Sequence, residues 1–207
     1  MSFQESYQQG VRRIASRSIT GLARTRVTPN QLTALGVTLC GVGALLVTFE
    51  NRNEILFFWA GAAAFIVGSV LDILDGALAR VGGKQSAFGA FLDSLVDRVG
   101  EGFMLTAVAY VFAREGNLLA VAVAAFAIAG SFLVPYARAK AEALGFRGDV
   151  GIGSRAERVV VISAGLILAP WGVLPWAIGL LAVTAWVTVV QRVLHVRREL
   201  RKAAPLS

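Results

Sequence analysis

The stretch LDILDGALARVGGKQSAFGAFLDSLVDRVGE, from Leu71 to Glu101, carries four aspartates inside otherwise apolar sequence. Asp72 and Asp75 are three residues apart, and Asp93 and Asp97 are four residues apart. On a helix, each of these spacings places both side chains on one face. Carboxylates are costly at membrane depth. The stretch therefore predicts two helices whose acidic faces share a stabilising interaction.

The composition around this stretch is that of a membrane protein. Of the 207 residues, 56% are hydrophobic and only 16% are charged, whereas about a quarter of the residues in a soluble domain are charged. Apolar runs of about 20 residues can cross a bilayer, and the sequence predicts six of them. The predicted spans are 31–49, 55–78, 88–113, 118–137, 155–170 and 174–191. We therefore expect an all-α integral membrane protein with six transmembrane helices, built as one domain over residues 1–207.

The basic residues support this topology. With six spans, 18 of the 20 Lys and Arg residues fall on one side of the membrane, and only Arg52 and Arg114 fall on the other. The positive-inside rule places the basic side in the cytoplasm. This predicts a multi-pass protein of the cell membrane whose acidic helices open toward the cytoplasm. The basic residues follow the topology and do not form a groove with interleaved aromatics, so a net charge of +7 does not indicate nucleic-acid binding.

Residues 1–26 are polar and basic, without the apolar core of a signal peptide. We expect an amphipathic juxtamembrane helix on the inner leaflet here, and a solvated basic tail fits as well. Two capping boxes mark helix starts further along the chain: Thr28 with Gln31, and Ser154 with Glu157.

Four acids on two neighbouring helices allow three interpretations: a charge network that joins the helices, an ion or metabolite pathway of a transporter, or a metal site. Gly76 and Gly89 lie four residues from Asp72 and Asp93 and permit close approach of the two helices. Oxygen-only ligands suit Mg²⁺ and Mn²⁺, and no His or Cys adjoins them to favour zinc. Four aspartates on two adjacent helices, with glycines at matched offsets, favour the metal site. A transporter would be supported by discontinuous helices and inverted repeats, and the sequence shows neither.

The pattern D-x2-D-G-x2-A-R-x8-G-x3-D-x3-D resembles the signature of the CDP-alcohol phosphotransferase family. The matched positions are Asp72, Asp75, Gly76, Ala79, Arg80, Gly89, Asp93 and Asp97. The resemblance implies a metal-dependent enzyme with six membrane helices that commonly forms a homodimer. Its reaction would transfer a phosphatidyl-type group from a CDP-activated donor, such as CDP-diacylglycerol (CDP-DAG), to an alcohol, with release of CMP.

The same resemblance implies roles for individual residues. The predicted ligands of Mg²⁺ (or Mn²⁺) are Asp72, Asp75, Asp93 and Asp97. Asp97 would also be the general base. Gly76 and Ala79 would leave room for the nucleotide, and Arg80 would hold the diphosphate. Asn30 and Thr33, at the start of the first span, are further nucleotide-binding candidates, and helix capping and packing explain them almost equally well.

The acceptor is indicated by the basic segment PYARAKAEALGFRGDVGIGSRAERVVV, residues 135–161. A neutral alcohol needs no cations, whereas arginines bind phosphate through paired hydrogen bonds. The segment resembles the phosphatidylinositol phosphate synthases of actinobacteria, which implies 1D-myo-inositol 3-phosphate as the acceptor. The implied phosphate ligands are Arg138, Lys140, Arg155, Arg158 and Arg192. Relative to that subgroup, the Arg and Lys at 138 and 140 are exchanged, so a phosphatidylglycerophosphate synthase and a di-myo-inositol phosphate phosphate synthase stay open as alternatives.

Overall fold

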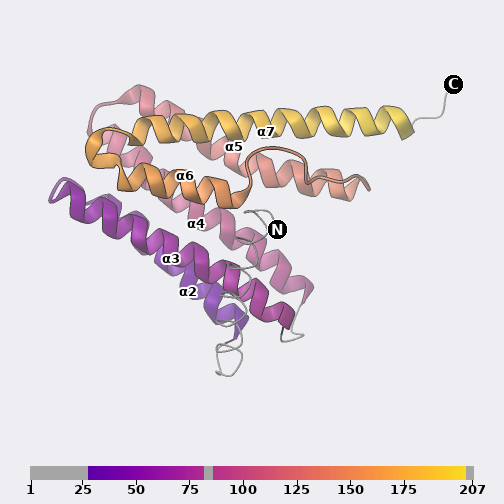
Figure 1. The fold of residues 1–207 in the computed structure, drawn as a ribbon, viewed down its shortest axis with the longest axis horizontal. Coiled ribbons are helices and arrows are strands. Elements are labelled where there is room, and N and C mark those ends of the chain that lie inside the picture. The colour runs from indigo at the N-terminus through magenta and orange to yellow at the C-terminus, as the bar shows by residue number, and fades with distance from the viewer. Residues whose placement is uncertain (1–27, 82–85, 204–207) are drawn as a thin grey trace, which may run out of the picture.

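A computed structural model describes residues 28–81 and 86–203, except the side chains of Arg80, Val81 and Ala203. The predicted juxtamembrane helix within residues 1–26 lies outside these residues. The described chain is all-helical (Figure 1). Its elements are α2 (Pro29–Val47), α3 (Glu54–Val81), α4 (Ala87–Arg114), α5 (Leu118–Ala143), α6 (Arg155–Ile167), the short 3-10 helix η1 (Ala169–Trp171) and α7 (Leu174–Ala203).

The six predicted helices are confirmed, with differences in length. Within the described residues, α2, α3, α5 and α7 are long and apolar enough to cross a membrane. The 28-residue α4 is long enough but carries the charged stretch, and α6 has only 13 residues. The span predicted for 155–170 ends early because Pro170 lies in η1 and Gly172 follows with a φ of 73°. Conversely, α7 continues well beyond the predicted end at Gln191.

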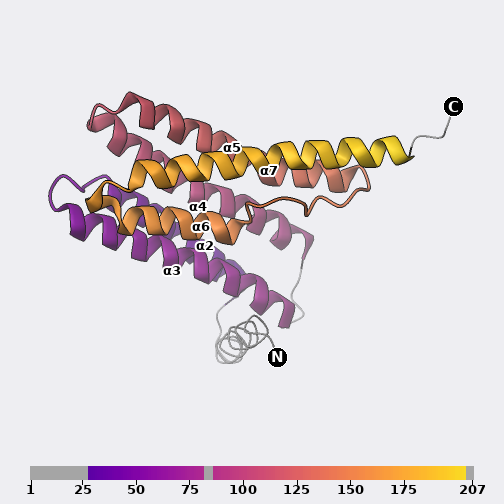
Figure 2. The same ribbon diagram turned by 45° about the horizontal axis from the view of Figure 1, so that its top comes forward.

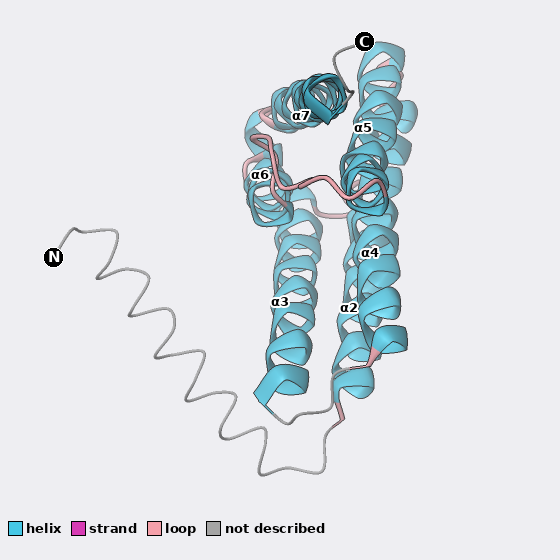
Figure 3. Ribbon diagram, turned by 90° about the vertical axis from the view of Figure 1, so that its right-hand side faces the viewer, coloured by secondary structure: helices cyan, strands magenta, loops and turns pink. Residues whose placement is uncertain are grey.

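The helices form two columns of three. Helices α3, α6 and α7 make one column, and α2, α4 and α5 make the other (Figure 3). Contacts of α2 with α3 and of α5 with α7 join the columns. The connections α2–α3, α4–α5 and α6–α7 lie at one end, and the α5–α6 connection lies at the other (Figures 1 and 2). This agrees with the predicted alternation of six spans.

The columns meet around α4, whose central residues Met104, Leu105, Val108 and Val111 have no exposed surface. Both predicted capping boxes are present. Gln31 and Glu157 each bond back to the backbone N–H of the cap residue, at 3.0 and 2.7 Å. These bonds fix where α2 and α6 begin, and both starts carry candidate site residues.

Helices α2 and α3 pack almost backbone to backbone through pairs of glycines. A Cβ added at Gly36 would lie 2.9 Å from the carbonyl oxygen of Gly68, and one at Gly43 would lie 2.8 Å from that of Gly61. Backbone oxygens cannot move aside as a flexible side chain can, so glycine is needed at these crossings. The same approach brings Gly36 against Asp72, whose Cβ would be 3.7 Å from the added atom. The glycine contact therefore sets the depth of one of the four aspartates.

Candidate active site

Three of the four aspartates converge. One oxygen each from Asp72 and Asp75 of α3 and Asp93 of α4 lie within 4.8 Å of one another. Asp72 and Asp75 are buried, with 4% and 3% of their surfaces exposed. The i, i+3 spacing on α3 and the neighbouring start of α4 thus produce the predicted meeting of carboxylates.

Helix α2 supports this group from the other side. The Thr33 hydroxyl donates a hydrogen bond to Oδ2 of Asp75, and it also lies 3.1 Å from the carbonyl oxygen of Pro29. Thr33 lies one turn into α2, whose start is fixed by the Thr28 capping box. The bond therefore fixes the orientation of the Asp75 carboxylate relative to α2. Thr33 thus lies beside the acids, and its predicted contact with a nucleotide stays a prediction.

The donor set fits a hard divalent cation. Within the described part of the chain, Oδ1 of Asp72 is buried and has no hydrogen-bond partner. A buried carboxylate oxygen without a partner is costly, and three carboxylate oxygens this close repel one another. A cation ligated by all three would remove both costs, and an oxygen-only set suits Mg²⁺ or Mn²⁺.

Asp97 adjoins the group of three but is not one of the acids whose oxygens lie within 4.8 Å of one another. Arg155, the first residue of α6, lies between Asp97 and Asp72. Its Nη2 is 2.6 Å from Oδ1 of Asp97, and its Nη1 pairs with Oδ2 of Asp72. Asp97 and Asp72 therefore share the guanidinium of Arg155.

A cavity of about 470 Å³ opens beside Asp75 and Asp93. It lies between the start of α2, the end of α3 and the start of α4. Its walls include all four small or polar residues predicted for nucleotide binding, namely Asn30, Thr33, Gly76 and Ala79. Thr28, Ser86 and Gly89 also line it and were not predicted as nucleotide-binding residues. The side chain of Arg80 lies outside the described residues, so its predicted contact with a diphosphate stays a prediction.

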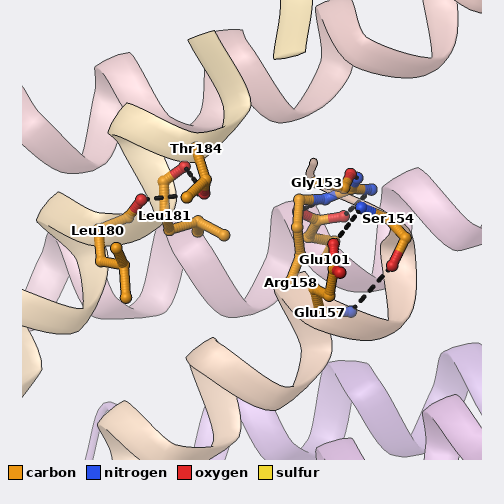
Figure 4. A network of polar contacts seen from close by, with 8 residues as sticks. All are labelled: Glu101, Gly153, Ser154, Glu157, Arg158, Leu180, Leu181 and Thr184. Atoms are coloured by element: carbon orange, nitrogen blue, oxygen red, sulfur yellow. Dashed lines mark hydrogen bonds and ion pairs between the residues drawn. The ribbon is translucent and has the colours of Figure 1, made fainter. Parts of the chain in front are cut away.

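Arg158, one of the predicted phosphate ligands, pairs with an acid of α4 in the structure. It is buried, and its guanidinium forms two parallel bonds with Glu101 of α4, from Nε to Oε1 at 2.9 Å and from Nη2 to Oε2 at 3.0 Å (Figure 4). Its Nη1 donates to the carbonyl oxygen of Gly153 at 3.0 Å. All three nitrogens of the guanidinium thus have a hydrogen-bond partner. Glu101 was missed, although it follows Asp97 by four residues and shares its helix face.

The other predicted phosphate ligands lie on α5 and α7. Arg138 pairs with Glu142 at 2.8 Å, and the Lys140 ammonium lies 5.8 Å from the Tyr136 ring centre. Arg192 donates from Nε to the carbonyl oxygen of Val150 at 2.9 Å and from Nη1 to that of Val134. Of the five predicted phosphate ligands, only Arg155 touches the aspartates.

Comparison with known proteins agrees with this site. The model of the family described as CDP-alcohol phosphatidyltransferase matches residues 26–196. The archaetidylinositol phosphate synthase of Pyrococcus horikoshii is 36% identical over 182 residues, which cover 86% of this chain and 88% of that protein. The phosphatidylinositol phosphate synthase of Streptomyces avermitilis is 38% identical over 193 residues, which cover 88% and 77%.

The phosphatidylinositol phosphate synthase of Mycobacterium tuberculosis has a similar solved fold at 32% identity. Its crystal structure with manganese and citrate superposes with a TM-score of 0.78 and covers 88% of both chains. Its structure with CDP-DAG bound gives the same TM-score and covers 89% of this chain and 94% of that one. The family match, the shared fold and the convergent aspartates lead to one conclusion: this chain is a multi-pass membrane enzyme that belongs to the CDP-alcohol phosphatidyltransferase family.

Proposed function

We propose that this protein is a phosphatidylinositol phosphate synthase, which transfers the phosphatidyl group of CDP-DAG to 1D-myo-inositol 3-phosphate and releases CMP. The observation that carries the proposal is the position of the three aspartates Asp72, Asp75 and Asp93 on one side of the 470 Å³ cavity, with Arg155 of α6 on their other side. A nucleotide diphosphate and a phosphorylated acceptor can thus approach the same carboxylates from two directions. The names of these three relatives all include inositol phosphate.

Asp72, Asp75 and Asp93 would hold Mg²⁺ or Mn²⁺. When bound, the cation supplies charge neutralisation for the diphosphate and for the departing CMP. The nucleotide would occupy the adjoining cavity. There, Gly76 and Ala79 leave room on α3, Asn30 and Thr33 present polar groups from α2, and Arg80 would bind the diphosphate.

Asp97 is proposed as the general base. The acceptor hydroxyl oxygen attacks the β-phosphorus of CDP-DAG, the bond from that phosphorus to the CMP oxygen breaks, and the hydroxyl proton passes to the Asp97 carboxylate. The position of Asp97 outside the group of three suits this role, because a metal ligand has less freedom to take up a proton. Its contact with Arg155 at 2.6 Å orients the carboxylate toward the side from which the acceptor arrives.

Arg155 is the strongest candidate for the acceptor phosphate, because it begins α6, where the helix dipole also favours an anion. Arg138, Lys140 and Arg192 would extend the cationic surface. Arg158 would need to break its two bonds to Glu101 to contact substrate directly. We therefore propose that it acts mainly by positioning Gly153 and the start of α6 (Figure 4).

We further propose that the enzyme is a homodimer of the cell membrane, formed by one catalytic domain per chain, with its site facing the cytoplasm. The excess of Lys and Arg at the end of the bundle that carries the aspartates supports this orientation.

The test is an assay of the purified full-length chain with labelled CDP-DAG and Mg²⁺, offering inositol 3-phosphate, glycerol 3-phosphate and free inositol in parallel. We expect CMP and labelled phosphatidylinositol phosphate with the first acceptor. Turnover with glycerol 3-phosphate alone would make the protein a phosphatidylglycerophosphate synthase. Turnover of CDP-inositol without lipid would make it a di-myo-inositol phosphate phosphate synthase, and flux across liposomes without CMP release would make it a transporter.

A further inference from the structure

A second, larger cavity lies away from the aspartates, between the C-terminal halves of α5 and α7. It has a volume of about 640 Å³. Nine of its lining residues are apolar or aromatic, four are Lys or Arg, and none of them is acidic. No residue that lines the cavity beside Asp75 also lines this groove. The groove is therefore separate from the proposed nucleotide site.

The groove runs from the depth of the acyl chains to the depth of the headgroups. A helix rises about 1.5 Å per residue, so Val193 lies about 29 Å along α7 from its start at Leu174. The hydrocarbon core is about 30 Å thick. With the start of α7 at the opposite membrane surface, Val189 and Val193 would therefore lie within the hydrocarbon core, and Arg197 and Arg201 would lie at the level of the polar headgroups. The groove is apolar at one end and basic at the other.

Two of its four cations are available at that basic end. Arg192 is held by two backbone carbonyl oxygens, and Lys140 lies over the Tyr136 ring. Arg197 and Arg201 are exposed, and neither forms an ion pair or hydrogen bond within the described part of the chain. In contrast, Lys202 of α7, which does not line the groove, pairs with Glu199 at 2.7 Å. The two arginines are thus free to bind an anion above an apolar groove.

We propose that this groove binds one anionic phospholipid of the cytoplasmic leaflet. An acyl chain would lie between α5 and α7 against Val189 and Val193, and the phosphate would lie between Arg197 and Arg201. Charge complementarity selects this occupant, since the lining offers cations and no acid. A zwitterionic lipid would bring the positive charge of its own headgroup in among these cations. The donor CDP-DAG would instead place its nucleotide beside Asp75, on the walls of the other cavity.

The test is native mass spectrometry of the purified full-length protein, titrated with phosphatidylglycerol or with phosphatidylcholine of the same chains. We expect one phosphatidylglycerol per chain to be retained with clear preference. In the double variant Arg197→Gln/Arg201→Gln, its affinity should fall about 10- to 30-fold, since each basic residue near an anionic headgroup contributes about fivefold. The matched control is Arg198→Gln/Lys202→Gln, which removes the same charge from the same helix outside the groove and should lose less than about threefold.

A second variant tests the apolar part. Val193→Trp fills the groove without changing charge, and Val193 is 58% exposed, so the larger side chain does not disturb the core. It should also lose the retained lipid, while its thermal unfolding stays that of the unchanged protein. Soluble glycerol 3-phosphate should not compete, because it lacks the chain. Equal losses in the two double variants, or equal retention of both lipids, would overturn the proposal. The readout is binding without turnover, so it is independent of the acceptor assignment.

Discussion

Arg158 and Glu101 form a buried ion pair with two parallel bonds of 2.9 and 3.0 Å, which joins the start of α6 to the middle of α4. The pair lies between the aspartates on α4 and the residues that begin α6. Because Arg158 also holds the Gly153 carbonyl oxygen, the pair fixes the loop that leads to Arg155. The position of Arg155 therefore depends on the ion pair that Arg158 forms one turn further along α6.

Replacing Glu101 with Gln should destabilise the protein, since breaking a buried pair leaves the remaining charge uncompensated at a cost of about 3–5 kcal/mol. Thermal unfolding in detergent measures the effect. The double variant Glu101→Leu/Arg158→Met removes both charges and should be more stable than Glu101→Gln. If Glu101→Gln unfolds at the temperature of the unchanged protein, the pair does not support the fold.

Gly36→Ala should lower both stability and metal affinity. The new Cβ would lie 2.9 Å from the Gly68 carbonyl oxygen, so α2 and α3 must separate at the point where Asp72 packs. Overpacking of this kind costs about 1–3 kcal/mol. Gly41→Ala on the same helix is the matched control, because its Cβ would meet Phe103 at an ordinary 3.6 Å. Equal behaviour of the two variants in thermal unfolding and Mn²⁺ binding would remove the close approach as the cause.

Asp97→Asn should abolish turnover while CDP-DAG binding stays largely intact, because the amide cannot take the proton of the acceptor. Asp72→Asn should instead weaken binding of both metal and nucleotide. Single-turnover CMP release and equilibrium binding of CDP-DAG separate the two effects. Near-normal turnover of the Asp97 variant would exclude it as the base.

Arg155→Lys should raise the KM for inositol phosphate about tenfold or more, because a lysine cannot make the paired hydrogen bonds of a guanidinium. Steady-state kinetics at saturating CDP-DAG gives the value. Arg147→Lys, on the exposed α5–α6 connection, is the control and should leave KM unchanged. An unchanged KM in the Arg155 variant would place the acceptor phosphate elsewhere.

The parts of this molecule that sequence predicts are those encoded locally. The spacing of Asp72 and Asp75, the box of Thr28 with Gln31 and the alternation of apolar runs with basic loops depend on residues a few positions apart, and each is found in the structure. The end of α7 was placed too early, because a polar surface beyond Gln191 interrupts the apolar run without interrupting the helix.

Contacts between distant residues were not predictable. Arg158 and Glu101 are 57 residues apart, and their meeting is visible only once α6 and α4 are placed in the fold. The same holds for Arg155, which a basic segment marks as a phosphate ligand but which the fold places between Asp72 and Asp97. The sequence likewise does not show which helix Gly36 and Gly43 face, whereas the structure places them against Gly68 and Gly61.

The account rests on Asp72, Asp75 and Asp93 binding one divalent cation together, and Mn²⁺ binding followed by electron paramagnetic resonance tests this most directly. We expect the purified full-length chain to bind Mn²⁺, Mg²⁺ to compete for the same site, and Asp72→Asn, Asp75→Asn and Asp93→Asn each to weaken binding by at least about tenfold, while exposed Asp149→Asn does not. Mn²⁺ affinity that is unchanged in all three variants would contradict the account.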